Sequence, residues 1–323
     1  MTVLFSVLGL AAVLVLGISY VCFRMAFLAR KEPPAGPDDY PTPEGAAYDP
    51  YRPQMIQWIR EVRALEHEDV SITSFDGLTL WGTYYESRPG APLELMFHGY
   101  RGNAERDLCG GVQRAFALGR NVLLVDQRTS CRSEGRVITF GVKEARDCRS
   151  WVDFCIGRFG SDVTIILTGI SMGAATVLMA AGEPLPKNVA VVLADCGYTT
   201  AREMIEKTIC EMHLPPRISY PFVRLGARLF GGFDPEDARP LEAVRRSAVP
   251  TIFFHGEDDH FVPCDMSRRN YEACAAPKAL MTVPGADHGL SYPADPTGYL
   301  QAVAAFFTEN GVPTEVLSTN HGK

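Results

Sequence analysis

From about residue 54 onward, short and continuously apolar runs alternate with segments that have the periodicity of helices. Such runs are typical of strands that are buried on both faces of a sheet, and intervening helices are the usual crossovers between parallel strands. The expected strands are 93–97, 121–125, 163–167, 189–194, 251–254 and 279–283, and the expected helices are 104–118, 143–158, 172–182 and 266–275. The pattern predicts an α/β fold in one domain, with a mostly parallel central sheet and helices on both faces.

Two features interrupt this alternation. Segments 70–75 and 78–85 flank Asp76-Gly77, which is a strong signal for a hairpin turn before the parallel strands. About sixty residues separate the strands at 189–194 and 251–254, more than one crossover helix needs. This interval contains helical segments at 200–212 and 219–230, so we expect a small helical lid insertion over about residues 198–240.

The N-terminal segment predicts a membrane anchor. Residues 3–23 contain no charge, and about twenty such residues span a bilayer. Neither a basic region before the segment nor a small-residue cleavage site after it is present, which argues for an uncleaved transmembrane helix over residues 1–24 rather than a signal peptide. Because a polar face is missing, a helix in the core of a soluble protein is the less favoured alternative.

Charges after the anchor predict its orientation. Arg24, Arg30 and Lys31 follow the apolar segment, so the positive-inside rule places the rest of the chain in the cytoplasm. Nine cysteines with no CxxC pair also fit a reducing compartment. A net charge of −7 and the lack of a long basic run exclude nucleic acid as the main partner. No feature of the sequence selects an oligomeric state.

Residues 25–53 are rich in proline, glycine and acidic residues. This composition predicts a linker that holds no helix and packs no core. The globular domain is then expected over residues 54–317, and residues 318–323 are expected to form a flexible tail.

Gly169-Ile170-Ser171-Met172-Gly173 lies between an expected strand and an expected helix. A G-x-S-x-G sequence in this context forms a tight strand-to-helix turn that exposes the serine hydroxyl above the sheet. The pattern alone is weak, but its position between strand and helix makes Ser171 a candidate nucleophile.

A serine nucleophile needs a base, and the base needs a carboxylate that orients it. The loop 255–263 follows one expected strand and contains Asp258 and Asp259, while the loop 285–289 follows the next strand and contains His288. All these residues come after the carboxyl ends of strands, where open α/β sheets place their sites. The order of serine, aspartate and histidine therefore predicts a catalytic triad.

The loop after the expected strand 93–97 reads His98-Gly99-Tyr100-Arg101-Gly102. Its glycines allow the backbone N–H of Tyr100 to point into the site, and the N–H of Met172 is the second candidate donor to a developing oxyanion.

Residues 65–310 resemble the serine α/β-hydrolase superfamily, and are most similar to membrane-anchored Bem46-like and serine aminopeptidase (S33)-like hydrolases. The motifs that carry the resemblance are HGYRGN, DQRTSCRSEG, GISMGA, ADCGYTT, HGEDDHFVP and GADHG. The resemblance implies a Ser–His–Asp hydrolase of carboxylic esters, thioesters or occasionally amides. The family pattern HGxxDxxVP selects Asp259 as the acid and leaves Asp258 as a solvated loop residue.

The chain departs from the family at one loop. Family members usually read D-x-R-G-H-G-x-S, whereas residues 126–133 lack both glycines and the histidine. This departure concerns the shape of that loop and not the triad.

Other side chains near these motifs are candidate pocket residues, namely His98, Arg101, Cys196, Tyr198 and His260. Three of these residues have a simpler interpretation: His98 and His260 fit a structural role better than that of a base, and Cys196 is a poor nucleophile candidate because Ser171 occupies the turn. No phosphate-binding glycine motif or metal-ligand spacing is present, so no cofactor and no metal are expected.

The lid insertion carries Arg217, Arg224 and Arg228 among apolar residues. Arg224 and Arg228 lie on one face of the expected helix. This basic face either rests on an anionic membrane surface and admits lipid-like substrates, or stays solvated while the apolar side of the lid packs on the core. The second interpretation is favoured.

Together these features predict a membrane-tethered serine hydrolase, of the carboxylesterase or lipase kind, that acts on a small acyl ester or a lipid-like substrate. A thioesterase that deacylates proteins or lipids, or a peptidase, is the alternative on the same triad. A non-catalytic binding protein with this fold is less favoured, because serine, acid, histidine and oxyanion loop are all intact.

Overall fold

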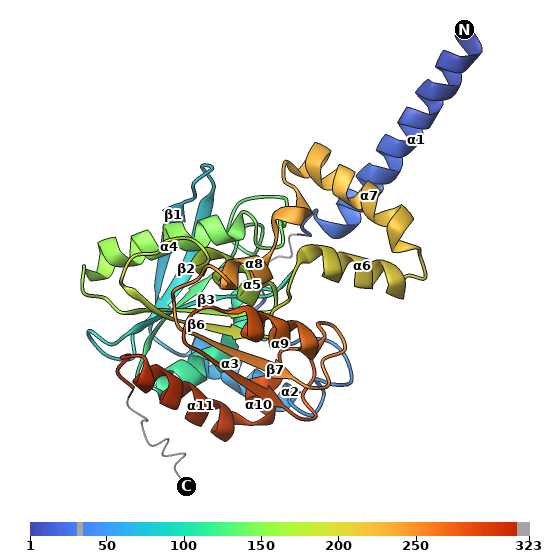
Figure 1. Cartoon of the computed structure of the whole chain (residues 1–323). Coiled ribbons are helices and arrows are strands. Elements are labelled where there is room, and N and C mark those ends of the chain that lie inside the picture. Colours follow the sequence, from blue (N-terminus) through green and yellow to red (C-terminus); the bar gives the residue numbers. More distant parts are fainter. Residues whose placement is uncertain (31–34, 315–323) are drawn as a thin grey trace.

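The computed structural model describes residues 1–30 and 35–314. The expected flexible tail at 318–323 lies outside the described residues. An eight-stranded sheet in the order β1-β2-β4-β3-β5-β6-β7-β8 runs through the molecule (Figure 1). β2 is antiparallel to β1 and β4, and all other neighbours are parallel. The prediction of a mostly parallel sheet opened by a hairpin is confirmed.

The strands lie close to their expected positions. They are β1 (Glu68–Thr73), β2 (Thr79–Tyr85), β3 (Leu93–Phe97), β4 (Asn121–Val125), β5 (Ile165–Ile170), β6 (Val189–Asp195), β7 (Thr251–Gly256) and β8 (Lys278–Val283). Gly77 has a φ of +87° in the turn between β1 and β2, a conformation that favours glycine. β5 continues to Ile170, three residues beyond its expected end, so that the strand leads directly into Ser171.

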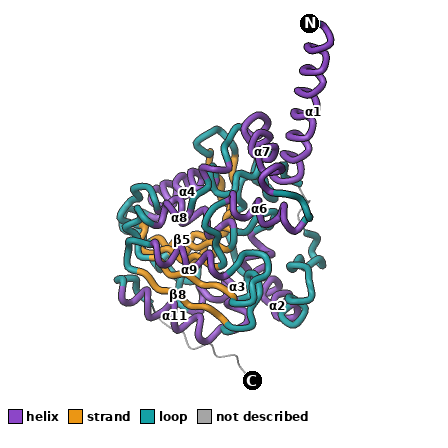
Figure 2. Tube along the Cα trace, turned by 45° about the vertical axis from the view of Figure 1, so that its right-hand side comes forward, coloured by secondary structure: helices purple, strands orange, loops and turns teal. Residues whose placement is uncertain are grey.

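Helices cover both faces of the sheet, as the α/β pattern predicts (Figure 2). On one face, α4 (Glu144–Phe159) and α5 (Met172–Ala181) pack against the strands, and Trp151 of α4 is fully buried in this part of the core. On the other face lie α3 (Ala104–Ala117) and α11 (Pro296–Glu309). The remaining helices of the domain are α2 (Arg52–Arg63), α8 (Pro240–Val244), α9 (Cys264–Ala273) and α10 (Ser291–Ala294).

The interval between β6 and β7 forms the expected helical insertion. It contains α6 (Ala201–Glu211), α7 (Pro216–Gly226), a π-helical turn η1 (Ala227–Gly231) and a short 3-10 turn η2 (Pro235–Asp237). We call residues 201–237 the lid. Arg224 is paired with Asp234 at 2.8 Å, and Arg228 lies 3.9 Å from the same carboxylate. Part of the basic face is therefore neutralised within the lid itself.

The N-terminal helix α1 (Thr2–Ala26) projects away from the domain beside the lid (Figure 1). It has a mean hydropathy of 2.4, and among the described residues it is the one helix long and apolar enough to cross a membrane. Residues 1–18 are exposed on all sides, whereas Ser19 and Phe23 are buried against the lid. The helix ends two residues beyond the expected boundary at residue 24, because its last turn is packed.

Residues 35–51, the described part of the expected linker before α2, pack against the domain. The side chains of Tyr40, Tyr48 and Tyr51 contact a buried cluster that includes Trp58. Arg63 donates hydrogen bonds to the carbonyl oxygens of residues 36, 37 and 39. The prediction that this segment packs no core is wrong, because tyrosines supply apolar surface and a guanidinium satisfies the carbonyls of an extended, proline-rich backbone.

The loop at 126–133 shows how the chain accommodates its unusual sequence. Thr129 and Cys131, which stand where the family has glycines, have φ values of +77° and +44°. Arg128 anchors the loop through Asp147 at 2.6 Å and Asp76 at 3.1 Å. The left-handed backbone conformation is thus kept without glycine, at a cost of about 1 kcal/mol or more for each residue.

Candidate active site

Ser171 lies on a tight turn between β5 and α5. Its φ of +56° and ψ of −116° are rare for a residue other than glycine, and such strain is typical of a nucleophile held above a sheet. The backbone of Ser171 is held on both sides, since its N–H donates to the Asp195 carbonyl at 2.9 Å and its carbonyl accepts from Ala175 at 3.1 Å. The predicted strand-turn-helix context of the motif is confirmed.

Both glycines of the motif are required by close backbone contacts. A Cβ at Gly173 would lie 2.0 Å from the Phe97 carbonyl oxygen, and a Cβ at Gly169 would lie 2.1 Å from the Gly173 carbonyl oxygen. No side chain fits at either position without moving β3 or α5.

Gly173→Ala is expected to lower the free energy of unfolding by at least about 3 kcal/mol, because the clash is with backbone atoms that cannot rotate away. Gly157→Ala is the matched control, since Gly157 lies on the exposed face of α4 and a Cβ there meets nothing within 4 Å. The control is expected to gain up to about 1 kcal/mol from helix propensity. Thermal unfolding of the detergent-solubilised chain measures both effects, and an unchanged midpoint for Gly173→Ala would contradict the packing described here.

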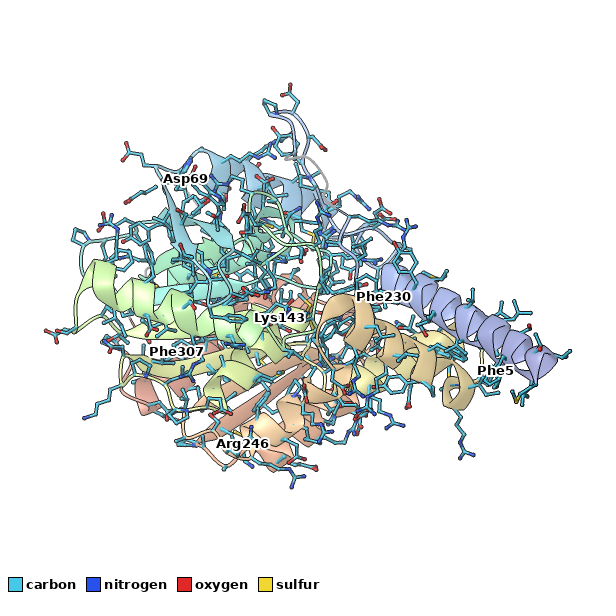
Figure 3. The ribbon with its side chains drawn as sticks, turned by 90° about the horizontal axis from the view of Figure 1, so that it is seen from above. Phe5, Asp69, Lys143, Phe230, Arg246 and Phe307 are labelled. Carbon is cyan, nitrogen blue, oxygen red and sulfur yellow. The ribbon has the colours of Figure 1, made fainter. Side chains whose placement is uncertain are left out.

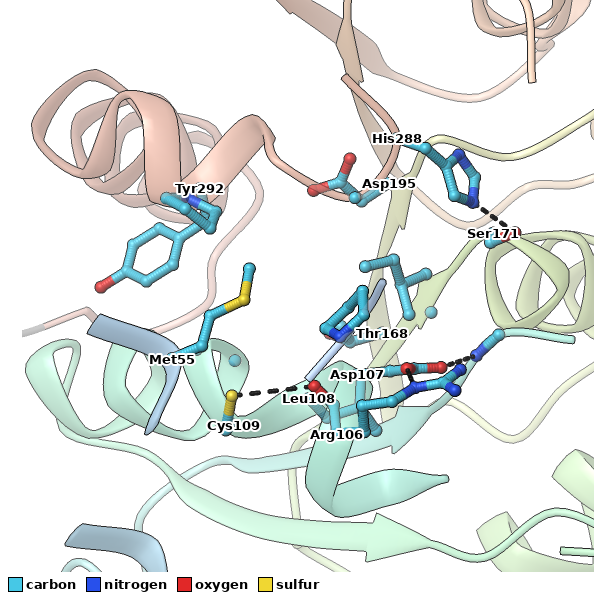
Figure 4. Close-up of a pocket in the computed structure, with 18 of the residues that line it drawn as sticks. Met55, Arg106, Asp107, Leu108, Cys109, Thr168, Ser171, Asp195, His288 and Tyr292 are labelled. Atoms are coloured by element: carbon cyan, nitrogen blue, oxygen red, sulfur yellow. Dashed lines mark hydrogen bonds and ion pairs between the residues drawn. The ribbon is translucent and has the colours of Figure 1, made fainter. Parts of the chain in front are cut away.

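Three sequence-predicted side chains meet at the carboxyl end of the sheet. The Nε2 atom of His288 lies 3.0 Å from Ser171 Oγ, and its Nδ1 atom lies 2.7 Å from Asp259 Oδ2 (the serine contact is dashed in Figure 4). They come from the ends of β5, β7 and β8, more than 100 residues apart for serine and histidine. The structure therefore forms a continuous relay from a carboxylate through an imidazole to a hydroxyl.

The environment of Asp259 keeps its carboxylate ionised. Burial by itself favours the neutral acid, but hydrogen bonds with His255 and His288 outweigh this effect and hold the pKa of Asp259 well below its ordinary value of 3.8. Its Oδ1 atom also accepts from the N–H groups of Phe261 and Val262 at 2.9 and 2.7 Å. Because the folded-state pKa is lowered, this carboxylate stabilises the fold above about pH 3.8, and the contribution is lost as the pH falls below that value toward the folded-state pKa.

The structure distinguishes the two neighbouring aspartates of this loop. Asp259 is buried and pairs with His288, whereas the side chain of Asp258 is exposed and takes no part in the relay. The choice of Asp259 that the family pattern implies agrees with this geometry.

The loop that carries Tyr100 passes directly beside the serine, since a Cβ at Gly99 would lie 3.5 Å from Ser171 Cβ. Asp107 accepts from the Gly99 N–H at 2.9 Å and so holds the loop against α3. Among the described residues, the N–H groups of Tyr100 and Met172 donate to no protein acceptor. Both candidate oxyanion donors are therefore available to a ligand.

The five candidate pocket residues take different positions. Arg101 and Tyr198 line a cavity that reaches Ser171, whereas His98, Cys196 and His260 line neither of the two cavities that do. The pocket prediction is wrong for Cys196 and His260, whereas His98 lines a neighbouring cavity that also includes Met172. His98 is fully buried, accepts a hydrogen bond from the Gln127 N–H, and has a pKa that burial lowers. The His260 ring is exposed to solvent and lies beside Asp287, 3.2 Å from its carboxylate.

Cys196 lies beneath the relay and not in the cavity wall. Its sulfur and the ligand atoms of Asp259 and His288 lie within 4.8 Å of one another. Complete burial raises the pKa of this thiol well above its ordinary value, so the group is a neutral thiol and a poor metal ligand. Asp259 and His288 already pair with each other, and the donor set does not fit a metal ion.

Two cavities open from Ser171. The first, which we call the α3-side cavity, has a volume of 180 Å³ and is lined by Tyr48, Trp58, Asp107, Arg114, Asp195 and Tyr292 among others. Figure 4 shows Asp107, Asp195 and Tyr292 around it. The second, which we call the lid-side cavity, has a volume of 330 Å³ and is lined mostly by apolar side chains of the lid and of α1. Because the two meet at the serine, a substrate can place one part in each.

Two further residues lie beside the relay, and sequence patterns missed one of them, Tyr48. The Tyr48 hydroxyl, from the expected linker, donates to the His288 carbonyl at 2.8 Å. Asp195 is buried at the wall of the α3-side cavity, where it accepts from Ser291 at 2.9 Å and Tyr299 at 3.0 Å. Burial raises the pKa of Asp195 above its ordinary value, and those hydrogen bonds offset only part of this rise. The position of residues 195–198 at the end of an expected strand predicts that they line the pocket, and Asp195 does so, whereas no local pattern points to Tyr48.

Comparison with known proteins agrees with this architecture. No protein-family model matches the chain. It is 29% identical over 199 residues to the uncharacterised protein YqkD of Bacillus subtilis, and the match covers 61% of this chain and 65% of that protein, less than two thirds of its length. The narrower resemblance to Bem46-like and S33-like hydrolases stays a prediction.

Solved structures give a more extensive match. The Pyrococcus furiosus esterase Pf2001 superposes with a TM-score of 0.62 at 23% identity, over 83% of this chain and 96% of that chain. The α/β hydrolase GrgF from Penicillium sp. sh18 superposes with a TM-score of 0.60 at 19% identity, over 76% and 99% of the two chains. The strand order, the turn at Ser171 and these likenesses together show that the chain has the α/β-hydrolase fold.

Proposed function

We propose that the chain is a serine hydrolase that cleaves carboxylic esters through Ser171, His288 and Asp259. The observation that carries the proposal is the unbroken relay, with 2.7 Å between Asp259 and His288 and 3.0 Å between His288 and Ser171. A serine, a base and an orienting acid in this geometry are the parts that acyl transfer needs. The likeness to an esterase fold supports an ester as the substrate bond.

The geometry supplies a role for each group. His288 Nε2 accepts the Ser171 proton while Oγ attacks the carbonyl carbon, and Asp259 keeps the proton on Nδ1. The N–H groups of Tyr100 and Met172 donate to the oxygen that becomes negative. When the tetrahedral intermediate breaks down, the alcohol leaves and takes the proton from His288. The acyl group then remains bound to Ser171 as an ester. Water, which gives a proton to His288, then attacks the acyl carbon. The Oγ–acyl bond breaks, Ser171 Oγ takes that proton back from His288, and the acid is released.

The test is reaction of the detergent-solubilised full chain with a fluorophosphonate probe, followed by turnover of an ester, a thioester and an amide that share one acyl group. Faster turnover of the thioester or amide would move the assignment to a thioesterase or peptidase. A well-folded chain that neither binds the probe nor hydrolyses any of the three would favour a binding protein with this fold.

We further propose that α1 tethers the enzyme to a membrane with the catalytic domain in the cytoplasm, since residues 3–23 carry no charge and Arg24 and Arg30 follow them. Cys210 on α6 has an exposed thiol and reports the side of the membrane. A membrane-impermeant maleimide is expected to label it only after permeabilisation of cells, and Cys210→Ser is expected to reduce that labelling. Labelling of Cys210 in intact cells would reverse the orientation.

A further inference from the structure

Exposed apolar side chains gather on one side of the molecule. Outside residues 1–26, the large apolar side chains that the described residues expose are Met212, Leu214, Ile218, Leu229, Phe230 and Phe261. The first five belong to the lid, and Phe261 lines the lid-side cavity. Exposed apolar residues concentrated in one patch mark a contact surface and not random scatter.

This patch is continuous with the anchor helix. The Phe230 ring lies 5.1 Å from that of Tyr20 and 5.9 Å from that of Phe23 (Figure 3 shows Phe230 beside α1). α7 crosses α1 very closely, since a Cβ at Gly226 would lie 2.2 Å from the Ser19 carbonyl oxygen. When about twenty residues of α1, counted from Thr2, span the bilayer, this crossing lies at the membrane surface. The lid is therefore held at the bilayer by the helix that spans it.

The same end of α1 forms a wall of the lid-side cavity. Cys22, Met25 and Ala26 line it on one side, and residues of α6 and α7 line it on the others, including Met204, Ile205, Ile209 and Val223. Its volume of 330 Å³ falls within the range of about 300–1,000 Å³ that is usual for ligand pockets. Ser171 and Met172 close its inner end. An apolar chain that enters beside α1 thus leads to the reacting serine.

The oxyanion loop is attached to the same helix end. The Tyr100 hydroxyl donates to the Ala26 carbonyl at 2.7 Å, and the Arg101 guanidinium donates to the Met25 carbonyl at 2.6 Å. These bonds satisfy carbonyls that the end of a helix leaves without partners. The anchor and the candidate oxyanion donor are consequently positioned as one unit.

We propose that the substrate is a bilayer-resident ester with a long hydrocarbon acyl chain, and that this chain enters the lid-side cavity from the membrane between α1 and the lid. The inference rests on the proposed serine hydrolase function and adds its substrate class. Charge attraction has a small part in it, because Arg224 and Arg228 already face Asp234. The apolar patch and the cavity wall supplied by α1 are what select a hydrocarbon chain in the bilayer.

A pair of neighbouring residues on α1 tests the proposal. Cys22 lines the cavity, whereas Val21 is 54% exposed and faces away from it. The full chain and its Cys22→Trp and Val21→Trp variants are incorporated into phosphatidylcholine vesicles and assayed with the butyryl and palmitoyl esters of 4-nitrophenol. Cys22→Trp is expected to lower the palmitoyl-to-butyryl ratio of kcat/KM at least tenfold, while Val21→Trp stays within twofold of the unaltered chain.

The controls separate this inference from the proposed function. Fluorophosphonate labelling reports a folded site in each variant, and Thr208→Trp on the α6 wall replaces Cys22→Trp if the latter does not label. An unchanged chain-length ratio in a labelled cavity variant overturns the entry route, as does an unaltered chain that hydrolyses the butyryl ester and not the palmitoyl ester. Failure of the unaltered chain to label and to hydrolyse either ester rejects the serine hydrolase itself.

Discussion

Ser171→Ala is expected to lower ester hydrolysis by on the order of 10⁴- to 10⁶-fold and to abolish reaction with a fluorophosphonate. The alanine removes the hydroxyl oxygen that lies 3.0 Å from His288 Nε2 and that the relay is positioned to activate. Water would then have to attack the substrate without an acyl-enzyme, and only the oxyanion donors and binding would still contribute. The loss should appear in kcat, with little change in stability, because the Ser171 side chain is small and lies at the cavity edge.

The measurement compares kcat and probe labelling for the full chain in detergent. Ser150→Ala on α4 is the matched control, since the Ser150 hydroxyl donates only to the Arg146 carbonyl within its own helix. This control should keep full activity. Retained probe labelling in Ser171→Ala would mean that another residue is the nucleophile, and the assignment of Ser171 would be withdrawn.

Asp259→Asn is expected to lower kcat by about 10⁴-fold while the protein remains folded. The carboxylate accepts a hydrogen bond from Nδ1 of His288, which leaves Nε2 as the acceptor that Ser171 needs. An asparagine amide can instead donate to Nδ1, and the proton then resides on Nε2, where it blocks removal of the serine proton. The effect therefore arises from the tautomer of the histidine and not from loss of a contact.

Asp258→Asn is the neighbouring control, because its side chain is exposed and lies outside the relay. It should change kcat less than twofold. Acid unfolding provides an independent check: Asp259→Asn should lose part of the stability that the ionised carboxylate supplies above about pH 3.8. Equal losses of activity in the two variants would show that the loop, and not the Asp259 carboxylate, is what catalysis requires.

Local patterns predicted most of the framework correctly. The buried strands, the hairpin turn at Gly77, the helical insertion and the apolar helix α1 all lie where their residue spacing placed them. These features depend on neighbouring residues, since periodicity and turn conformation are set within a few positions. The same holds for Ser171, because Gly169 and Gly173 leave the space that its tight turn needs.

Predictions about side-chain environment were less successful. His98, Cys196 and His260 lie close to the motifs in sequence, but two are buried in the framework and one faces solvent. The segment before α2 was expected to be a loose linker, yet Tyr48 reaches the carbonyl of His288, 240 residues away. Proximity in sequence does not determine which way a side chain points once the chain has packed.

The sequence by itself determined the order of strands and helices along the chain and the tight turn at Ser171, because each depends on local spacing and on glycine sterics. Strand ends also pointed to His288 and to the loop of Asp258 and Asp259, whereas the choice of Asp259 was implied by the resemblance to the hydrolase family. Only the tertiary structure decided that Tyr48 supports His288 and that α1 forms one wall of the lid-side cavity and receives hydrogen bonds from Tyr100 and Arg101. These contacts join segments far apart in the chain. They arise from the packing of apolar surfaces that are complementary in shape, which no local pattern of residues encodes.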